Sequence, residues 1–178
     1  MDQLDFTDTL MNTLVAFLRG IGLVVRPGRI PEQTFVPGIW IDRGVLVVDE
    51  ACLRFPGDLL HEAGHLAVAS PERRPTIVGD AGSDAAEEMM AIAWSYAAVL
   101  HLQLNPAVVF HSDGYHGDSA ALIENFQQGR YIGVPVLQWL GMTYDAIQAP
   151  THQVAPYPHM VEWLRTRNAK NEQATMCE

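Results

Sequence analysis

The chain has few basic residues, two cysteines and no apolar run long enough to cross a bilayer. Eleven lysines and arginines stand against 21 aspartates and glutamates, for a net charge of −10. Because phosphate neutralisation requires lysine and arginine, we expect no nucleic-acid partner and no adhesion to anionic membranes. The two cysteines, Cys52 and Cys177, do not make a disulfide framework, which fits a reducing compartment.

The N-terminal segment lacks the features of a secretory signal. Asp2, Asp5 and Asp8 occupy the positions where a signal peptide carries positive charge. The apolar stretch Leu10–Leu18 is interrupted by polar residues and is too short for a membrane span. We therefore expect a cytoplasmic protein with no membrane association.

The composition is that of a globular protein. Of the 178 residues, 48% are hydrophobic and 18% are charged, which is enough apolar material for one core. We expect a single domain over residues 1–167, followed by a polar C-terminal tail over residues 168–178.

Hydrophobic periodicity and turn residues predict an α+β fold. The segment Ala85–Leu102 is apolar on nearly all sides, which is typical of a central core helix. We expect a small, mostly antiparallel sheet packed on a helical bundle. The predicted strands are Leu23–Arg26 and a hairpin of Ile39–Ile41 with Val45–Val48; the other predicted helices lie near Leu10–Leu18, Leu59–Ala69, Ala120–Gln128, Val134–Leu140, Tyr144–Gln148 and Met160–Arg167.

One motif carries recognisable chemistry: His61-Glu62-Ala63-Gly64-His65, an H-E-x-x-H sequence on a predicted helix. Residues four apart lie one turn apart on the same helix face, so both imidazoles can bind one zinc ion. Glu62 is rotated by about 100° from His61, where it can take a proton from the attacking water. The alternative is an amphipathic helix with two surface histidines and a surface glutamate.

A third metal ligand must come from another segment. A metzincin would have glycine at position 68 and histidine at position 71, but the chain has Val68 and Pro71 there. The candidates are Glu87 and Glu88, at the start of the next long helix. Glu87 lies three residues after Asp84 in a capping-box pattern, so we prefer Glu88 as the ligand. Alternatively, both are solvated acids favoured by the helix dipole.

The order of hairpin, H-E-x-G-H helix and glutamate-led, alanine-rich helix resembles compact gluzincin-type zincins. It is most similar to the ImmA/IrrE-type bacterial metallopeptidases, through His61, Glu62, Gly64 and His65, followed by Glu88 and Ala91. The resemblance spans about residues 39–102; the later helix lacks the asparagine and phenylalanine of the family pattern. It implies a zincin-like fold with the H-E-x-x-H helix at its centre, bound zinc, and a peptide or protein substrate lying along the sheet edge.

Zincins commonly use a histidine or tyrosine to stabilise the oxyanion of the tetrahedral intermediate. The polar loop after residue 110 offers His111, Tyr115 and His116 for this role, or is a plain surface loop. In the same loop, Asp113 or Asp118 could orient a ligand imidazole.

Two further expectations concern the segments before the motif helix. Either hairpin strand, Ile39–Ile41 or Val45–Val48, could accept substrate by β-augmentation, or both are core strands. Cys52 has no histidine partner at a recognisable spacing, so we expect a small buried apolar side chain and not a nucleophile.

Together these patterns predict a zinc-dependent metallopeptidase. His61, His65 and Glu88 would hold the ion, and Glu62 would act as general base and later as general acid. The alternative from another functional class is a catalytically silent zinc-binding regulatory or interaction module. The sequence does not define the substrate or the oligomeric state.

Overall fold

The structure, a computed structural model, describes residues 5–31, 34–79, 81, 84–114 and 117–167. These residues form an α+β fold, as the periodicity predicted. The strands are β1 (Val24–Pro27), β2 (Ile39–Asp42), β3 (Val45–Val48) and β4 (Val78–Gly79); the α-helices are α1 (Thr9–Gly20), α2 (Asp58–Val68), α3 (Ala85–His101), α4 (Ser119–Gln127), α5 (Val134–Trp139) and α6 (Ala149–His152); short 3₁₀ turns cover Arg74–Thr76 and Pro106–Val108.

The four strands form one sheet in the order β1-β3-β2-β4. β2 pairs antiparallel with β3 and with β4, while β1 runs parallel to β3, so the sheet is mostly antiparallel. The predicted hairpin is confirmed, with Arg43 and Gly44 at its turn. Both residues have positive φ, 51° and 78°, which matches the right-handed twist of the two strands.

The strand order corrects one expectation about the sheet edge. β2 and β3 are both interior strands, because β1 pairs with the outer side of β3 and β4 pairs with part of β2. The apolar run of β3 fits this position, since interior strands are buried on both faces. The edges of the sheet are therefore β1 and β4.

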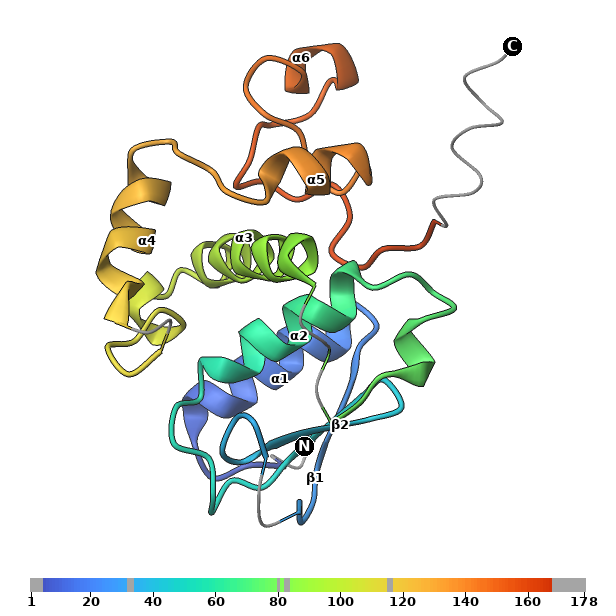
Figure 1. Ribbon diagram of the computed structural model, residues 1–178, viewed down its shortest axis with the longest axis vertical. Coiled ribbons are helices and arrows are strands. Elements are labelled where there is room, and N and C mark those ends of the chain that lie inside the picture. Colours follow the sequence, from blue (N-terminus) through green and yellow to red (C-terminus); the bar gives the residue numbers. More distant parts are fainter. Residues whose placement is uncertain (1–4, 32–33, 80, 82–83, 115–116, 168–178) are drawn as a thin grey trace.

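The helices are stacked on the sheet in successive layers (Figure 1). α1 contacts β1 and α2, α2 packs along α3, and α3 contacts α5. Every residue of α3 from Met90 to Val99 is buried, including Trp94, which confirms it as the central core helix. One hydrophobic cluster runs from Phe6 to Met160. No helix in the described ranges is both long and apolar enough to cross a membrane.

Two predicted helices near the C-terminus are wrong. Tyr144–Gln148 forms turns, and the only helical residues there are those of α6 that follow. Met160–Arg167 is irregular, because its backbone groups bond to other elements. Trp94 Nε1 donates to the carbonyl of Trp163 at 2.9 Å, and the amide of Arg165 donates to the carbonyl of Ala67 at 2.9 Å.

The expectation that Cys52 is buried is also wrong, because this side chain is exposed. Cys52 lies in the turn after β3, where its amide donates to the carbonyl of Asp49. Leu53 packs against the core in its place. The expected tail, residues 168–178, lies outside the described residues.

Candidate metal centre

The H-E-x-x-H residues lie on α2, which is buried along most of its length. Asp58 stands in the first turn, where a negative charge complements the helix dipole. Glu62 and His65 are buried, with 8% and 5% of their surfaces exposed. The two histidine rings of the motif are 4.8 Å apart between centroids and nearly perpendicular. The motif is therefore not an exposed pair of surface histidines.

The first turn of α3 comes close to this face of α2. Asp84 is the N-cap of α3 and accepts hydrogen bonds from the amides of Ala86 and Glu87, at 2.8 and 2.9 Å. Farther along, Gly64 lies against Ala91, so the two backbones approach closely. Small residues at this contact therefore allow the glutamate-bearing helix to come close to the histidines.

Ligand atoms from three side chains meet between the helices. Nε2 of His61 and Nε2 of His65 are 3.2 Å apart. Oε1 of Glu88 lies 3.5 Å from His61 Nε2, and its Oε2 lies 3.2 Å from His65 Nε2. Tetrahedral zinc with bonds of about 2.0–2.2 Å separates its ligand atoms by about 3.3–3.6 Å. One ligand atom from each of the three residues lies within 4.8 Å of the others, so within the described residues His61, His65 and Glu88 form a group compatible with one metal ion.

The charges at this site are strongly coupled. Hydrogen bonds from His61 and His65 hold the pKa of the Glu88 carboxyl well below its usual range. Burial disfavours protonation of His65, but the nearby carboxylates of Glu87, Glu88 and Glu62 favour it more strongly and raise the pKa of His65 to about 9. Acidic groups therefore surround His65, as expected where a cation is to be held.

Glu87 is neither a member of this group nor a solvated helix-start residue. Its Oε1 lies 3.5 Å from His65 Nδ1, on the side of the ring opposite to Nε2. Its other oxygen accepts a hydrogen bond from Arg73. The capping-box pattern predicted a purely local role, and the sequence gives no sign that residue 73 reaches residue 87.

The structure places His111 outside the group of three ligands. Its Nε2 lies 2.8 Å from an oxygen of Asp58, one turn before His61, and its ring stacks on Phe55. Its Nδ1 is buried. His111 thus connects its loop to α2, and its role toward a substrate stays a prediction. The other two residues proposed for the oxyanion, Tyr115 and His116, lie outside the described residues.

The carboxylates proposed to orient a ligand imidazole lie elsewhere. Asp113 pairs with Arg54 at 2.8 Å, on an exposed part of the loop. Asp118 stands at the N-cap position of α4. The carboxylate that faces a ligand imidazole from behind is Glu87.

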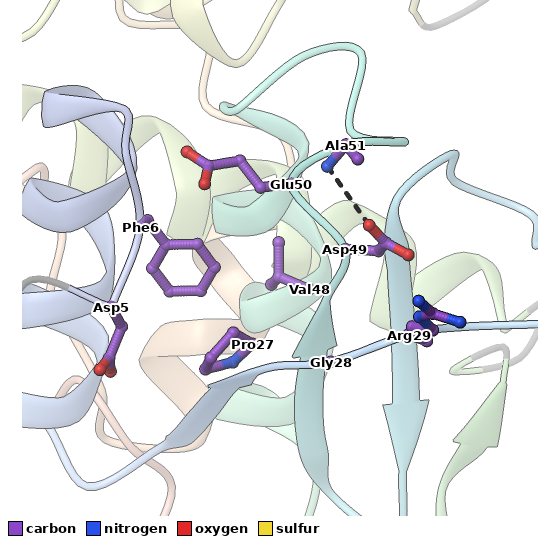
Figure 2. Close-up of a pocket in the computed structure, with 9 residues that line it drawn as sticks. All are labelled: Asp5, Phe6, Pro27, Gly28, Arg29, Val48, Asp49, Glu50 and Ala51. Carbon is purple, nitrogen blue, oxygen red and sulfur yellow. Dashed lines mark hydrogen bonds between the residues drawn. The ribbon is translucent and has the colours of Figure 1, made fainter.

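A separate pocket of about 380 Å³ lies between the N-terminal segment and the ends of β1 and β3. Figure 2 shows Phe6, Pro27 and Val48 facing one another there, with the carboxylate of Glu50 above them. Glu50 accepts hydrogen bonds from the amides of Thr7 and Asp8, at 3.0 and 2.8 Å. These bonds connect the chain before α1 to the end of β3, and none of the predicted site residues lines this pocket.

Comparisons of the chain with models of protein families, with curated proteins and with solved structures gave no match.

Proposed function

We propose that the protein is a zinc-dependent metallopeptidase with a zincin-like fold. The observation that carries the proposal is the group of ligand atoms from His61, His65 and Glu88. The two Nε2 atoms are 3.2 Å apart, and one oxygen of Glu88 lies 3.5 Å from the first while its other oxygen lies 3.2 Å from the second. Glu62, the buried residue next to the first histidine, supplies the remaining carboxylate of the motif. Two neutral imidazoles and one carboxylate form a zinc site of the open, catalytic type.

The ligands and Glu62 have different roles in this mechanism. His61, His65 and Glu88 would hold the ion, which when bound would act as a Lewis acid toward the scissile carbonyl and lower the pKa of the attacking water. Glu62 accepts a proton from that water on a carboxylate oxygen. The same carboxyl then donates the proton to the nitrogen of the leaving amine.

A peptide or protein substrate would pair with a free edge of the sheet. On β1, the side chain of Arg19 donates to the carbonyl of Val25 at 3.1 and 2.6 Å, so part of that edge is occupied. β4 lies in the chain between α2 and α3, which carry the three ligands. These two facts favour the β4 edge for an extended substrate segment.

The test combines metal analysis with cleavage of a peptide library followed by mass spectrometry. We expect about one zinc per chain and hydrolysis by the wild type. Glu62→Gln should keep the zinc and lose activity by about 10²- to 10⁴-fold, since it removes the general base. Glu124→Gln, an exposed change on α4, is the matched control and should keep both.

Three outcomes would overturn the proposal at different steps. A zinc content far below one ion per chain would mean that the protein has no zinc site. Equal turnover by the wild type and Glu62→Gln would mean that Glu62 takes no part in the reaction. Bound zinc without any hydrolysis indicates a catalytically silent zinc-binding module.

A further inference from the structure

Three side chains from three segments form a chain of contacts that ends at His65, on the side of the ring away from His61 and Glu88. Arg73 comes from the turn after α2, Glu87 from the first turn of α3, and His65 from α2 itself. One guanidinium nitrogen of Arg73 donates to Oε2 of Glu87, and another donates to the carbonyl of Ala81. Arg73 is thus held at two points while it holds Glu87.

The inner end of this chain contains two buried polar atoms that face each other. His65 Nδ1 and Glu87 Oε1 are 3.5 Å apart, and neither has a hydrogen-bond partner among the residues that the structure describes. A buried N–H and a buried carboxylate oxygen each cost free energy when left unpaired. A movement of about 0.5 Å would form a normal N–H···O bond between them.

That bond would determine which ring nitrogen of His65 carries the proton. With the hydrogen on Nδ1 and donated to Glu87, the lone pair of Nε2 is directed toward His61 and Glu88, 3.2 Å from each. A carboxylate behind a metal-binding histidine fixes the ring and raises its basicity. The opposite tautomer would direct a hydrogen into the space between the three ligands.

We propose that Glu87 and Arg73 are positioning residues of the metal centre: Glu87 orients His65 through Nδ1, and Arg73 holds Glu87 in place. The inference rests on the proposed zinc site and adds the residues that prepare it. A simple ion pair between the loop and α3 would need only the Arg73 contact. It would not require the second oxygen of Glu87 to face the imidazole of a metal ligand.

The first test measures the dissociation constant for zinc by competition with a chromophoric chelator. Glu87→Gln keeps the size of the side chain and removes its charge, and it should weaken zinc binding by about 10- to 100-fold. The matched control is Asp84→Asn, which removes one negative charge from the same helix end and keeps a good N-cap. The control should change the constant by no more than about 2-fold, because surface charges at this range are screened.

The second test asks whether Arg73 acts through Glu87. Arg73→Gln should weaken zinc binding by less than Glu87→Gln does, and Arg73→Lys should recover part of the loss. The double variant should bind zinc no more weakly than Glu87→Gln alone, because its two changes interrupt one chain of contacts. Losses that multiply in the double variant would overturn the role of Arg73.

A spectroscopic test uses the folded wild-type protein. The Nδ1–H proton of His65 should give a protected, downfield NMR signal in the zinc-bound wild type that is lost or moves upfield in Glu87→Gln. The absence of this signal from the zinc-bound wild type would overturn the inference, even if Glu87→Gln failed to fold.

The remaining outcomes separate this inference from the proposed function. If the wild type binds no zinc, both fail. If the wild type binds zinc and Glu87→Gln binds it as tightly as Asp84→Asn does, only the positioning role fails. If Glu87→Gln loses zinc entirely while Glu88→Gln retains it, Glu87 is itself the ligand and the inference is wrong.

Discussion

Gly64 of α2 lies directly against Ala91 of α3. A Cβ atom at position 64 would come within 3.0 Å of the Ala91 carbonyl oxygen and 3.2 Å of its Cα. Gly64 stands immediately before His65, and Ala91 lies one turn after Glu88. The absence of one side chain thus sets the distance between the helices that carry the three proposed ligands.

The first prediction concerns this contact. In Gly64→Ala, the added methyl group should push α3 away from α2 and weaken zinc binding by about 10-fold, as expected when ligand positions shift. The gain in helix propensity, about 1 kcal/mol, should offset part of the packing cost of about 1–3 kcal/mol. Chelator competition measures the affinity, and urea denaturation of the metal-free protein measures the stability.

The matched control is Gly20→Ala, at the end of α1. A Cβ atom there meets nothing within 4 Å, so this variant should keep the zinc affinity of the wild type. If Gly64→Ala binds zinc as tightly as Gly20→Ala does, the close approach of the two helices does not affect zinc affinity.

The second prediction concerns the coupling of zinc to folding. A ligand at about 100 times its dissociation constant stabilises the folded state by about 2.7 kcal/mol. At that concentration, zinc should therefore raise the unfolding free energy of the wild type by about 2.7 kcal/mol. His61→Ala should show almost none of this gain, because it removes one of the three ligands. Thermal and urea unfolding with and without zinc measure the difference.

His152→Ala is the control for this experiment, since it deletes an exposed imidazole on α6. It should respond to zinc as the wild type does. If zinc stabilises His61→Ala as much as it stabilises the wild type, His61 is not a metal ligand.

The third prediction follows from the raised pKa of His65 in the metal-free protein. Its pKa is about 9, against an ordinary value of 6.5, so the folded state favours the imidazolium form. The resulting stability is fully present below pH 6.5 and is lost as the pH rises through 9. The unfolding free energy of the metal-free protein should therefore fall by up to about 3 kcal/mol over this range.

Urea unfolding at a series of pH values checks this fall. Zinc affinity should rise over the same range, because His65 must release its proton to bind the ion. His65→Gln should flatten the stability curve, whereas His159→Gln, a change at an exposed histidine, should leave it unchanged. A wild-type curve that stays flat from pH 6.5 to 9 contradicts the predicted charge state.

Local sequence patterns predicted the structure correctly where a segment's own residues determine it. The spacing of His61 and His65 placed both on one helix face, and Asp84 gave the start of α3. The hairpin was predicted because the turn residues Asp42, Arg43 and Gly44 separate two apolar runs. Glu88 was preferred as third ligand because the capping-box pattern gave Glu87 a local role, and the structure brings Glu88 to the two histidines.

Patterns failed where contacts between distant segments decide the structure. The segment Met160–Arg167 has helix-like spacing, but its backbone bonds to α2, to the Trp94 indole and to Met142. Glu87 lies behind His65 and accepts a hydrogen bond from Arg73, 14 residues earlier in the chain. Such pairings depend on how the helices pack, which periodicity within one segment does not encode.

The last prediction concerns how the C-terminal segment is held to the end of α2. The guanidinium of Arg74 donates to the carbonyls of Leu66, Ala69 and Arg165, at 2.7, 3.0 and 2.8 Å. The first two are among the carbonyls that a helix end leaves without partners. Arg74→Met keeps much of the apolar stem and removes every donor, so it should lower the unfolding free energy by about 2–3 kcal/mol.

Arg26→Met is the control, because Arg26 makes one exposed ion pair, with Asp42 at 3.4 Å, worth less than about 1 kcal/mol. None of the three carbonyls that accept from Arg74 belongs to a proposed metal ligand, so zinc bound per folded chain should stay constant. Equal unfolding midpoints in urea for Arg74→Met and Arg26→Met would contradict the role of Arg74 in holding the segment.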